Sequence, residues 1–412
     1  MKRSRIYTLL VALSLAGFPL IAGGTTFLGL SSTSYSIAMR AAIIGLSALL
    51  LVMAVVGNTI KFVRGTFWLP ILVFWFAYLL RIYVDTTSDP GSLSRTTSDY
   101  WIWAVGACLI PMLGLLTYCK ADYLTSSYKL SLIMLALASV FVVLTGSGSF
   151  PQNSGLNVDI GRLNIQSLNP ISVGHLGVSL LLLSIWPFMR HGRIFFGYKQ
   201  ILFILTGFLG LYLLLASASR GPFVAFVLII VFYLSAQNLK RSLKILILAA
   251  ILVGAISQLG NYLENSGGYR FLSRSESTLS GEDKSVAIRQ LSYMGAADQF
   301  IQSPLFGDSL EEKETRYYPH NVILESFMAT GLIGGLPFIF VILFGTFISY
   351  TVIKTKSENG WVPLIFMQYL IAAQFSGALY TATTMWAFLG ATIVLFKRNL
   401  KTPDRLLKPT KC

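Results

Sequence analysis

The sequence predicts an all-α integral membrane protein with about 12 transmembrane helices. Of its 412 residues, 54% are hydrophobic and 12% are charged, whereas an ordinary soluble domain carries about 25% charged residues. Its apolar runs are long enough, at about 20 residues each, to cross a bilayer as helices that satisfy their own backbone hydrogen bonds. Such long uninterrupted runs also exclude a membrane β-barrel, whose strands alternate apolar and polar residues.

The expected spans follow the apolar runs along the chain. The first run follows Lys2, Arg3 and Arg5, as in a secretion signal, but it lacks a convincing small-residue cleavage site and is interpreted as a span. The full set is expected near residues 6–24, 38–57, 66–84, 101–118, 130–146, 171–189, 200–217, 222–237, 244–260, 322–350, 361–379 and 383–397.

Charged residues predict the orientation of these spans. On this map 21 basic and 3 acidic side chains fall on one side of the membrane, and 11 basic and 14 acidic side chains fall on the other. Because Lys and Arg are retained on the cytoplasmic side of short loops, both termini are expected in the cytoplasm. The net charge of +15 therefore reflects membrane orientation and attraction to anionic membrane lipids. It does not imply a nucleic-acid partner.

The chain is expected to form a single polytopic membrane domain over residues 1–400. Most connections are short, but residues 261–319, between the ninth and tenth spans, form an external loop that is too long for a simple connector. Apolar residues at helical spacing predict a short helix inside this loop, over residues 286–302. The basic segment 398–412 is expected to be a cytoplasmic tail.

Motifs for nucleotide and metal chemistry are missing from the sequence. It has no Walker loop, no dinucleotide fingerprint and no clustered His/Cys set. The cysteines, Cys108, Cys119 and Cys412, give no disulfide framework or zinc pattern. We therefore expect no cofactor and no metal, so the energy for any reaction must come from the substrate or from a gradient.

Arg220 is the sharpest candidate for binding an anion. It lies in Ser217-Ala-Ser-Arg220-Gly-Pro222, where one span ends and the next begins. Gly and Pro mark a tight turn there, which would hold the guanidinium at the external interface. A fixed fork of donors suits a phosphate or a diphosphate. The alternative is an interfacial arginine that reaches toward lipid headgroups.

His320 is the candidate general base. It starts the tenth span, whose helix is expected to break at Gly331, Gly334, Gly335 and Pro337 and so to line a cavity. An imidazole with an ordinary pKa near 6.5 is largely neutral at external pH and could take a proton from a sugar hydroxyl. The alternative is a helix-capping histidine.

Three further arginines are candidates with structural alternatives. Arg289 starts the predicted loop helix and could be carried toward Arg220, or it could be a solvated loop residue. Arg162 precedes the sixth span and Arg81 ends the third, so either could line an anionic cavity. For both, a structural pair with a nearby acid is favoured, for instance Arg81 with Asp85.

These residues together resemble the O-antigen ligase and polymerase superfamily. The resemblance rests on the order of five motifs and covers about residues 155–350. The first half of the chain matches only through topology and a weaker Gly161-Arg162-Leu163. The motifs are Ser217-Ala-Ser-Arg220-Gly, then Arg289, Pro304-Leu-Phe-Gly307, His320-Asn-Val-Ile-Leu-Glu325 and Thr330-Gly-Leu-Ile-Gly334.

The resemblance implies a membrane glycosyltransferase of the C-type fold in the bacterial inner membrane, with its active site facing the periplasm. Members take a glycan from undecaprenyl diphosphate and join it to a sugar hydroxyl. By position, Arg220 and Arg289 would hold the diphosphate and His320 would orient or deprotonate the acceptor. Glu325 would orient His320, or it is a buried helix polar group. Arg162 and Arg81 are candidate supporting residues.

The resemblance leaves the acceptor open. The segment between Arg289 and His320 is shorter than in many lipid A-core ligases, which favours a polymerase acting on lipid-linked repeat units, with a chain-length regulator as a candidate partner. A ligase that transfers the glycan to lipid A-core is the alternative. A transporter of lipid-linked oligosaccharide is a further one, although such carriers usually show internal repeats, and none is evident between residues 1–200 and 201–400.

Overall fold

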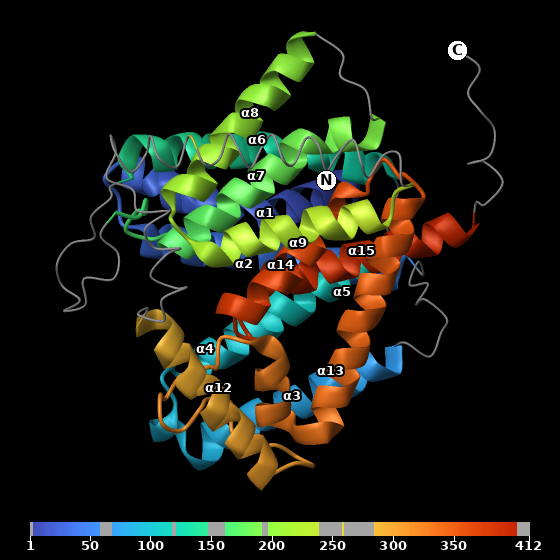
Figure 1. The fold of residues 1–412 in the computed structure, drawn as a ribbon. Helices are drawn as coiled ribbons and strands as arrows, with labels where there is room; N and C mark the ends of the chain where they lie inside the picture. The colour runs from blue at the N-terminus through green and yellow to red at the C-terminus, as the bar shows by residue number, and fades with distance from the viewer. Residues whose placement is uncertain are drawn as a thin grey trace. The chain divides into compact units, whose positions relative to one another are not determined.

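The computed structural model describes residues 3–57, 68–117, 121–146, 161–191, 197–238, 258 and 284–401, and these fold almost entirely into helices (Figure 1). Among them no β-strand is present beyond two isolated bridges. The described elements are α1 (Arg3–Phe27), α2 (Ser32–Val56), α3 (Trp68–Ser88), η1 (Pro90–Ser92), α4 (Thr97–Trp101), η2 (Ile102–Leu109), α5 (Ile110–Leu116), α6 (Ala121–Thr145), α7 (Pro170–His191), α8 (Tyr198–Ala216), α9 (Arg220–Ser235), α12 (Lys284–Gln302), α13 (Val322–Lys354), α14 (Trp361–Ser376) and α15 (Thr383–Lys401).

The described helices agree with the predicted spans. Seven stretches are long and apolar enough to cross a membrane, namely α1, α2, α3, the run from α4 to α5, α6, α7 and α13. Four shorter apolar helices, α8, α9, α14 and α15, coincide with further predicted spans. The expected span at residues 244–260 lies outside the described residues. The chain is therefore an all-helical, multi-pass membrane protein, and the count of 12 spans stays a prediction.

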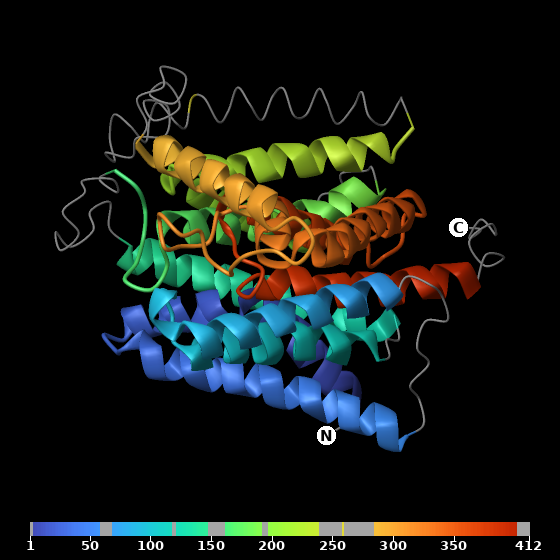
Figure 2. The same ribbon diagram turned by 90° about the horizontal axis from the view of Figure 1, so that it is seen from below.

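The loop helix predicted over residues 286–302 is confirmed as α12, Lys284–Gln302. Seen from below, the irregular segment 303–321 winds from the end of α12 to the start of α13 (Figure 2). The rest of the expected loop, residues 261–283, and most of the expected tail, residues 402–412, lie outside the described residues.

The chain packs as two compact units. Unit 1 contains Met1–Leu10, Ile44–Leu124 and Ile288–Cys412, and unit 2 contains Val11–Ile43 and Thr125–Ala287. The expected single membrane domain over residues 1–400 stays a prediction.

In unit 1, α13 packs against α3, α14 and α15, and α15 packs against α5 (Figure 1). Aromatic rings fill the space between α3, α13 and α15. Phe74 stacks on Trp386 with 5.5 Å between ring centroids and lies 4.9 Å from Phe338. All three side chains are at most 1% exposed. Close aromatic packing of this kind holds helices together where no water is present to drive their association.

Helix α13 breaks once, at Gly331, whose φ of +58° and ψ of −154° lie in a region that only glycine adopts readily. The prediction of further breaks at Gly334, Gly335 and Pro337 is wrong, because α13 stays helical at these residues. The glycines serve close packing instead. A Cβ on Gly334 would lie 3.2 Å from the Cβ of Ala77 on α3.

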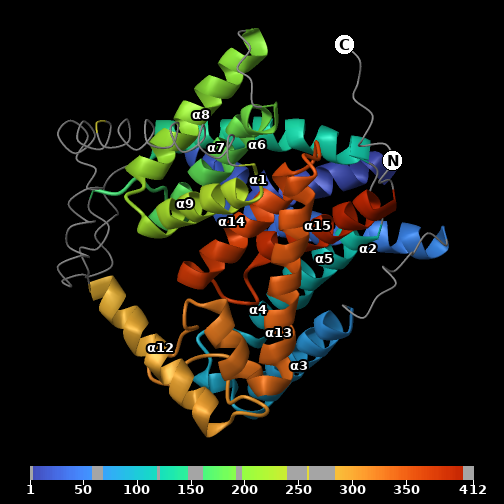
Figure 3. The ribbon, with the colours of Figure 1, turned by 45° about the vertical axis from the view of Figure 1, so that its right-hand side comes forward.

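In unit 2, α7 packs against α8 and α9, and Figure 3 shows these three helices side by side. The α7–α8 crossing depends on two glycines. A Cβ on Gly177 would lie 2.6 Å from the carbonyl oxygen of Gly210, and a Cβ on Gly210 would lie 2.8 Å from that of Gly177. Small residues that let two backbones approach closely are the usual basis of helix packing in membranes.

Candidate functional site

His320 lies two residues before the start of α13 and has a left-handed backbone, with a φ of +57°. This region costs a non-glycine residue about 1–2 kcal/mol. The next residue fixes the conformation, because Asn321 Oδ1 accepts hydrogen bonds from the backbone N–H groups of Ile323 and Leu324, both at 3.0 Å. Asn321 Nδ2 also donates to the carbonyl of Gln374. Strained non-glycine residues cluster at functional sites, so the backbone supports His320 as a candidate.

Tyrosine rings surround the His320 imidazole. The ring of Tyr318 lies 4.7 Å from it, between centroids, and that of Tyr317 lies 5.5 Å away. Tyr380 extends the cluster, 6.4 Å from Tyr318. The exposed Arg95 donates a hydrogen bond to Tyr317. Within the described part of the chain, the buried Nδ1 of His320 has no hydrogen-bond partner.

The pKa of His320 is lowered from 6.5 to about 4. The larger cause is burial, which penalises the charged imidazolium, and the second is repulsion by the positive charge of Arg289. Both causes favour the neutral ring. The imidazole of His320 is therefore unprotonated throughout the neutral pH range.

Arg289 lies on the face of α12 that is turned into unit 1. Arg289, Ser292 and Gln299 recur at spacings of three or seven residues, which place them on one side of the helix. Ser292 and Gln299 are 2% and 5% exposed, and Gln299 Nε2 donates to Asp308 Oδ2 at 3.1 Å. This face of α12 contacts the segment 303–321, which contains His320. The charge of Arg289 is therefore close enough to lower the pKa of the imidazole.

The hydrogen bonds of Glu325 do not involve His320. Its Oε1 accepts a hydrogen bond from Tyr78 at 3.0 Å and its Oε2 accepts one from the backbone N–H of Leu379 at 2.9 Å. The side chain is fully buried, and it connects α3 and the segment before α15 to α13. The geometry therefore favours the alternative of a buried helix polar group.

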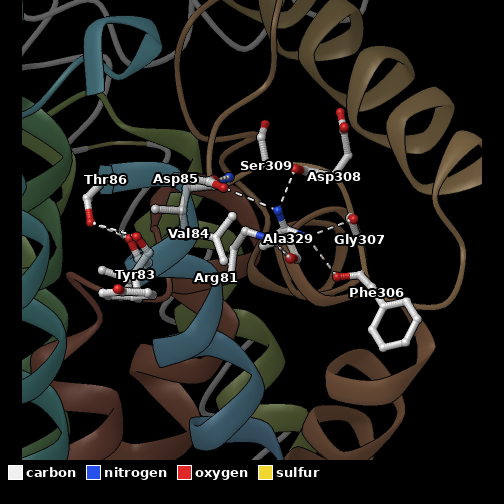
Figure 4. A network of polar contacts seen from close by, with 12 residues as sticks. Arg81, Tyr83, Val84, Asp85, Thr86, Phe306, Gly307, Asp308, Ser309 and Ala329 are labelled. Atoms are coloured by element: carbon white, nitrogen blue, oxygen red, sulfur yellow. Dashed lines mark hydrogen bonds and ion pairs between the residues drawn. The ribbon is translucent and has the colours of Figure 1, made fainter. Parts of the chain in front are cut away.

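Arg81 donates hydrogen bonds to backbone carbonyls on both sides of the contact between residues 306–308 and the kink of α13 (Figure 4). Its predicted ion pair with Asp85 is confirmed, with 3.2 Å between Nη1 and Oδ1. The other donors are used by backbone carbonyls far away in sequence. Nε donates to Ala329 at 2.8 Å, and the two terminal nitrogens donate to Phe306, Gly307 and Asp308 at 2.8–3.0 Å. These contacts fasten residues 306–308 to the kink of α13.

We expect Arg81→Gln to lower the free energy of unfolding by about 3–5 kcal/mol, as is usual when one partner of a buried charged network is removed. An amide cannot reach four carbonyls and an acid at once. The measurement is thermal unfolding of the purified protein in detergent. Arg316→Gln, at an exposed position, is the control and should change the midpoint little. An equal effect of the two substitutions would contradict this role for Arg81.

In unit 2, Arg162 fixes the turn that leads into Arg220. Arg162 is 8% exposed; its Nε donates to the carbonyl of Ser217 at 3.3 Å and its Nη2 donates to Ser219 Oγ at 2.7 Å. The turn also contains Ala218, with a left-handed φ of +43°. These contacts hold the Arg162 guanidinium against the turn, and the favoured pair with a nearby acid stays a prediction. Asp159 lies outside the described residues.

Arg220 is the first residue of α9 and is half-buried. The backbone N–H groups of a helix's first turn, together with the helix dipole, favour an anion at this end. The structure thus places Arg162 and Arg220 together in unit 2, and Arg289 and His320 together in unit 1.

Several residues near His320 were not predicted from the sequence. Glu311 is 3% exposed and accepts hydrogen bonds from Ser94 and Tyr100. It thereby fixes the segment of Arg95 beside Tyr317. The doublet Tyr317-Tyr318 just before Pro319 and His320 was a usable signal. Glu311 and Arg95 gave none, because their partners are distant in sequence.

The described residues form the apolar helices of a multi-pass membrane protein. Arg220 lies at the start of a helix, and the neutral imidazole of His320 lies on a left-handed backbone. Residues 205–339 match the family model described as O-antigen ligase. Over this stretch the resemblance to the O-antigen ligase and polymerase superfamily is confirmed. No curated protein and no solved structure matches the chain. The matched stretch includes Arg220, Arg289 and His320.

Proposed function

We propose that this protein is a periplasm-facing glycosyltransferase of the bacterial inner membrane that transfers a glycan from undecaprenyl diphosphate to a sugar hydroxyl. The family match supports the reaction class. The single observation that carries the mechanism is the neutral, strained His320 imidazole, which lies within electrostatic reach of Arg289. A base and a cation in one unit suit a reaction in which a proton is removed and an anion is released.

In the proposed reaction, the acceptor hydroxyl oxygen attacks the anomeric carbon while His320 takes its proton. The bond from that carbon to the diphosphate breaks, and undecaprenyl diphosphate leaves with the electron pair. Attack opposite the leaving group inverts the anomeric centre. The resemblance to the family supports the proposal that Arg220 and Arg289 contact the diphosphate. Their charges stabilise the leaving group as a metal ion would, so we propose a metal-independent transferase.

We favour a polymerase that extends lipid-linked repeat units, and a ligase acting on lipid A-core is the second candidate. The support for the polymerase is the short segment between Arg289 and His320. A lipid-linked glycan serves as donor in both cases. A chain-length regulator would be a partner of the polymerase. A transporter of the same lipid-linked oligosaccharide would bind the diphosphate but release none.

The test uses purified protein in vesicles that contain an undecaprenyl-diphosphate oligosaccharide and EDTA, without nucleotide. We expect release of undecaprenyl diphosphate and a lengthened or transferred glycan. Separate reactions with a lipid-linked repeat unit and with lipid A-core as acceptor distinguish polymerase from ligase. Arg220→Ala and Arg289→Ala should each lower turnover about 100- to 1,000-fold, as loss of one charge-stabilising donor usually does.

Arg316→Gln, which changes an exposed cation, is the matched control and should keep full turnover. Size-exclusion profiles establish that each variant is folded. The assignment of the two arginines would be overturned if both alanine variants turned over at the rate of the control. Binding of the donor with no release of diphosphate would instead support the transporter.

A further inference from the structure

The segment Pro304–Asp308 is irregular, yet it exposes large apolar side chains. It contains the Pro304-Leu-Phe-Gly307 motif, and its Leu305 and Phe306 are 56% and 69% exposed. Ile301, at the end of α12 just before it, is 70% exposed. Loops in water are usually polar, so an apolar tip of this size indicates a different surrounding medium.

All five backbone carbonyls of residues 304–308 and the N–H groups of Gly307 and Asp308 are hydrogen-bonded within the protein, which leaves the N–H groups of Leu305 and Phe306. The carbonyls of Pro304 and Leu305 accept hydrogen bonds from the N–H groups of Leu332 and Ile333 in α13, at 2.8 and 3.2 Å. Arg81 binds the next three carbonyls, those of residues 306–308. The N–H of Gly307 donates to Ser303 and that of Asp308 donates to Met328.

This pattern is what lipid requires of non-helical backbone. In the hydrocarbon region an unsatisfied N–H or C=O costs several kcal/mol. An irregular segment is therefore stable there only when protein groups take its hydrogen bonds. In water the carbonyls of residues 306–308 could be hydrated instead, and the three hydrogen bonds that Arg81 donates to them would not be needed.

The apolar tip is also continuous with a lipid-facing helix surface. Ile333, to which Leu305 is hydrogen-bonded, is 43% exposed. It begins a stripe along the spanning helix α13 that includes the exposed side chains of Leu336, Phe340, Leu343 and Phe347. The polar groups begin immediately on the other side, where Asp308 forms an ion pair with Lys313 at 2.6 Å. The chain thus changes from apolar to charged between residues 306 and 308.

We propose that residues 304–307 form a membrane-inserted wedge whose occupant is the acyl chains of the bilayer leaflet at the start of α13. Arg81 holds the wedge in place from the protein side, and Asp308 with Lys313 marks the headgroup level. The wedge fixes the depth of the segment that joins Arg289 to His320. This last consequence rests on the proposed function, whereas contact with lipid does not.

The test is a nitroxide spin label at position 306, introduced as Phe306→Cys in a background with Cys119→Ser and Cys412→Ser and reconstituted in phospholipid vesicles without donor. Labels at Phe340→Cys and Arg316→Cys give the lipid-facing and water-facing references. We expect the label at 306 to collide with oxygen more than with a water-soluble nickel chelate, as the label at 340 does.

A label at 306 that meets the nickel chelate as readily as the one at 316 would overturn the wedge. Low accessibility to both reagents would overturn it too, because it would mean that protein covers the site. Turnover of the unsubstituted protein is measured separately in vesicles with donor. Absence of turnover there, together with a lipid-like signal at position 306, would contradict the catalytic assignment and leave the wedge intact.

Discussion

Replacing His320 with alanine is expected to lower turnover about 100- to 10,000-fold, the usual contribution of a positioned general base. The protein should remain folded. Asn321, not His320, provides the cap of α13, and alanine at a φ of +57° retains the same backbone strain rather than adding to it. The measurement is release of undecaprenyl diphosphate in the vesicle assay, with size exclusion as the check on folding.

The pH dependence of kcat/KM is a second and more specific test of His320. A base acts only when unprotonated, and the pKa of His320 is lowered to about 4. We therefore expect kcat/KM to be flat at neutral pH and to fall about tenfold per unit below pH 4. A bound diphosphate beside Arg289 would offset that cation, so the limb in kcat should lie at higher pH. The acid limb should be absent in His320→Ala, and its persistence there would contradict the assignment.

Gly331→Ala is expected to destabilise the protein strongly. A side chain at this φ and ψ costs about 1–3 kcal/mol, and the added Cβ would lie 2.4 Å from the carbonyl carbon and oxygen of Leu305. These atoms belong to the backbone of residues 304–308, which is fastened by Arg81 and α13, so no flexible side chain can move aside. We expect a total loss above about 3 kcal/mol, with overpacking added to strain.

The measurement is thermal unfolding in detergent, together with the yield of monodisperse protein. Gly45→Ala is the matched control, because a Cβ at Gly45 meets nothing within 4 Å. Because Gly45 lies in the middle of α2, Gly45→Ala should leave the free energy of unfolding unchanged or raise it by about 0.5–1 kcal/mol. If Gly331→Ala unfolded at the same temperature as Gly45→Ala, the kink would not be the rigid junction that the hydrogen bonds indicate.

The helix positions were largely predictable because they depend on local properties of the chain. Apolar runs of about 20 residues coincide with α1, α2, α3, α6 and α7, and helical spacing predicted α12. The Arg81–Asp85 pair was also predictable, since residues four apart on a helix are neighbours. The break at Gly331 was predicted correctly, but the next two glycines were not distinguished from it, because glycine serves both kinking and close packing.

The contacts around the candidate residues were not predictable in the same way. For Arg81 the sequence favours the pair with Asp85, but it does not indicate the carbonyls 225–248 residues away that accept the other hydrogen bonds of the guanidinium. For Glu325 the sequence leaves open whether it orients His320 or is a buried helix polar group, and the structure shows its acceptor oxygens bound to Tyr78 and Leu379. Nothing in the sequence indicates which distant donor satisfies each buried group.

By itself, then, the sequence determined that the chain is a multi-pass helical membrane protein and which family its second half resembles. These properties follow from hydropathy, charge distribution and the order of short motifs. Only the tertiary structure decided that Arg81 is used to hold the fold, and that His320 has a left-handed backbone and a lowered pKa. The physical reason is that a buried polar group must find a partner, and long-range packing selects that partner.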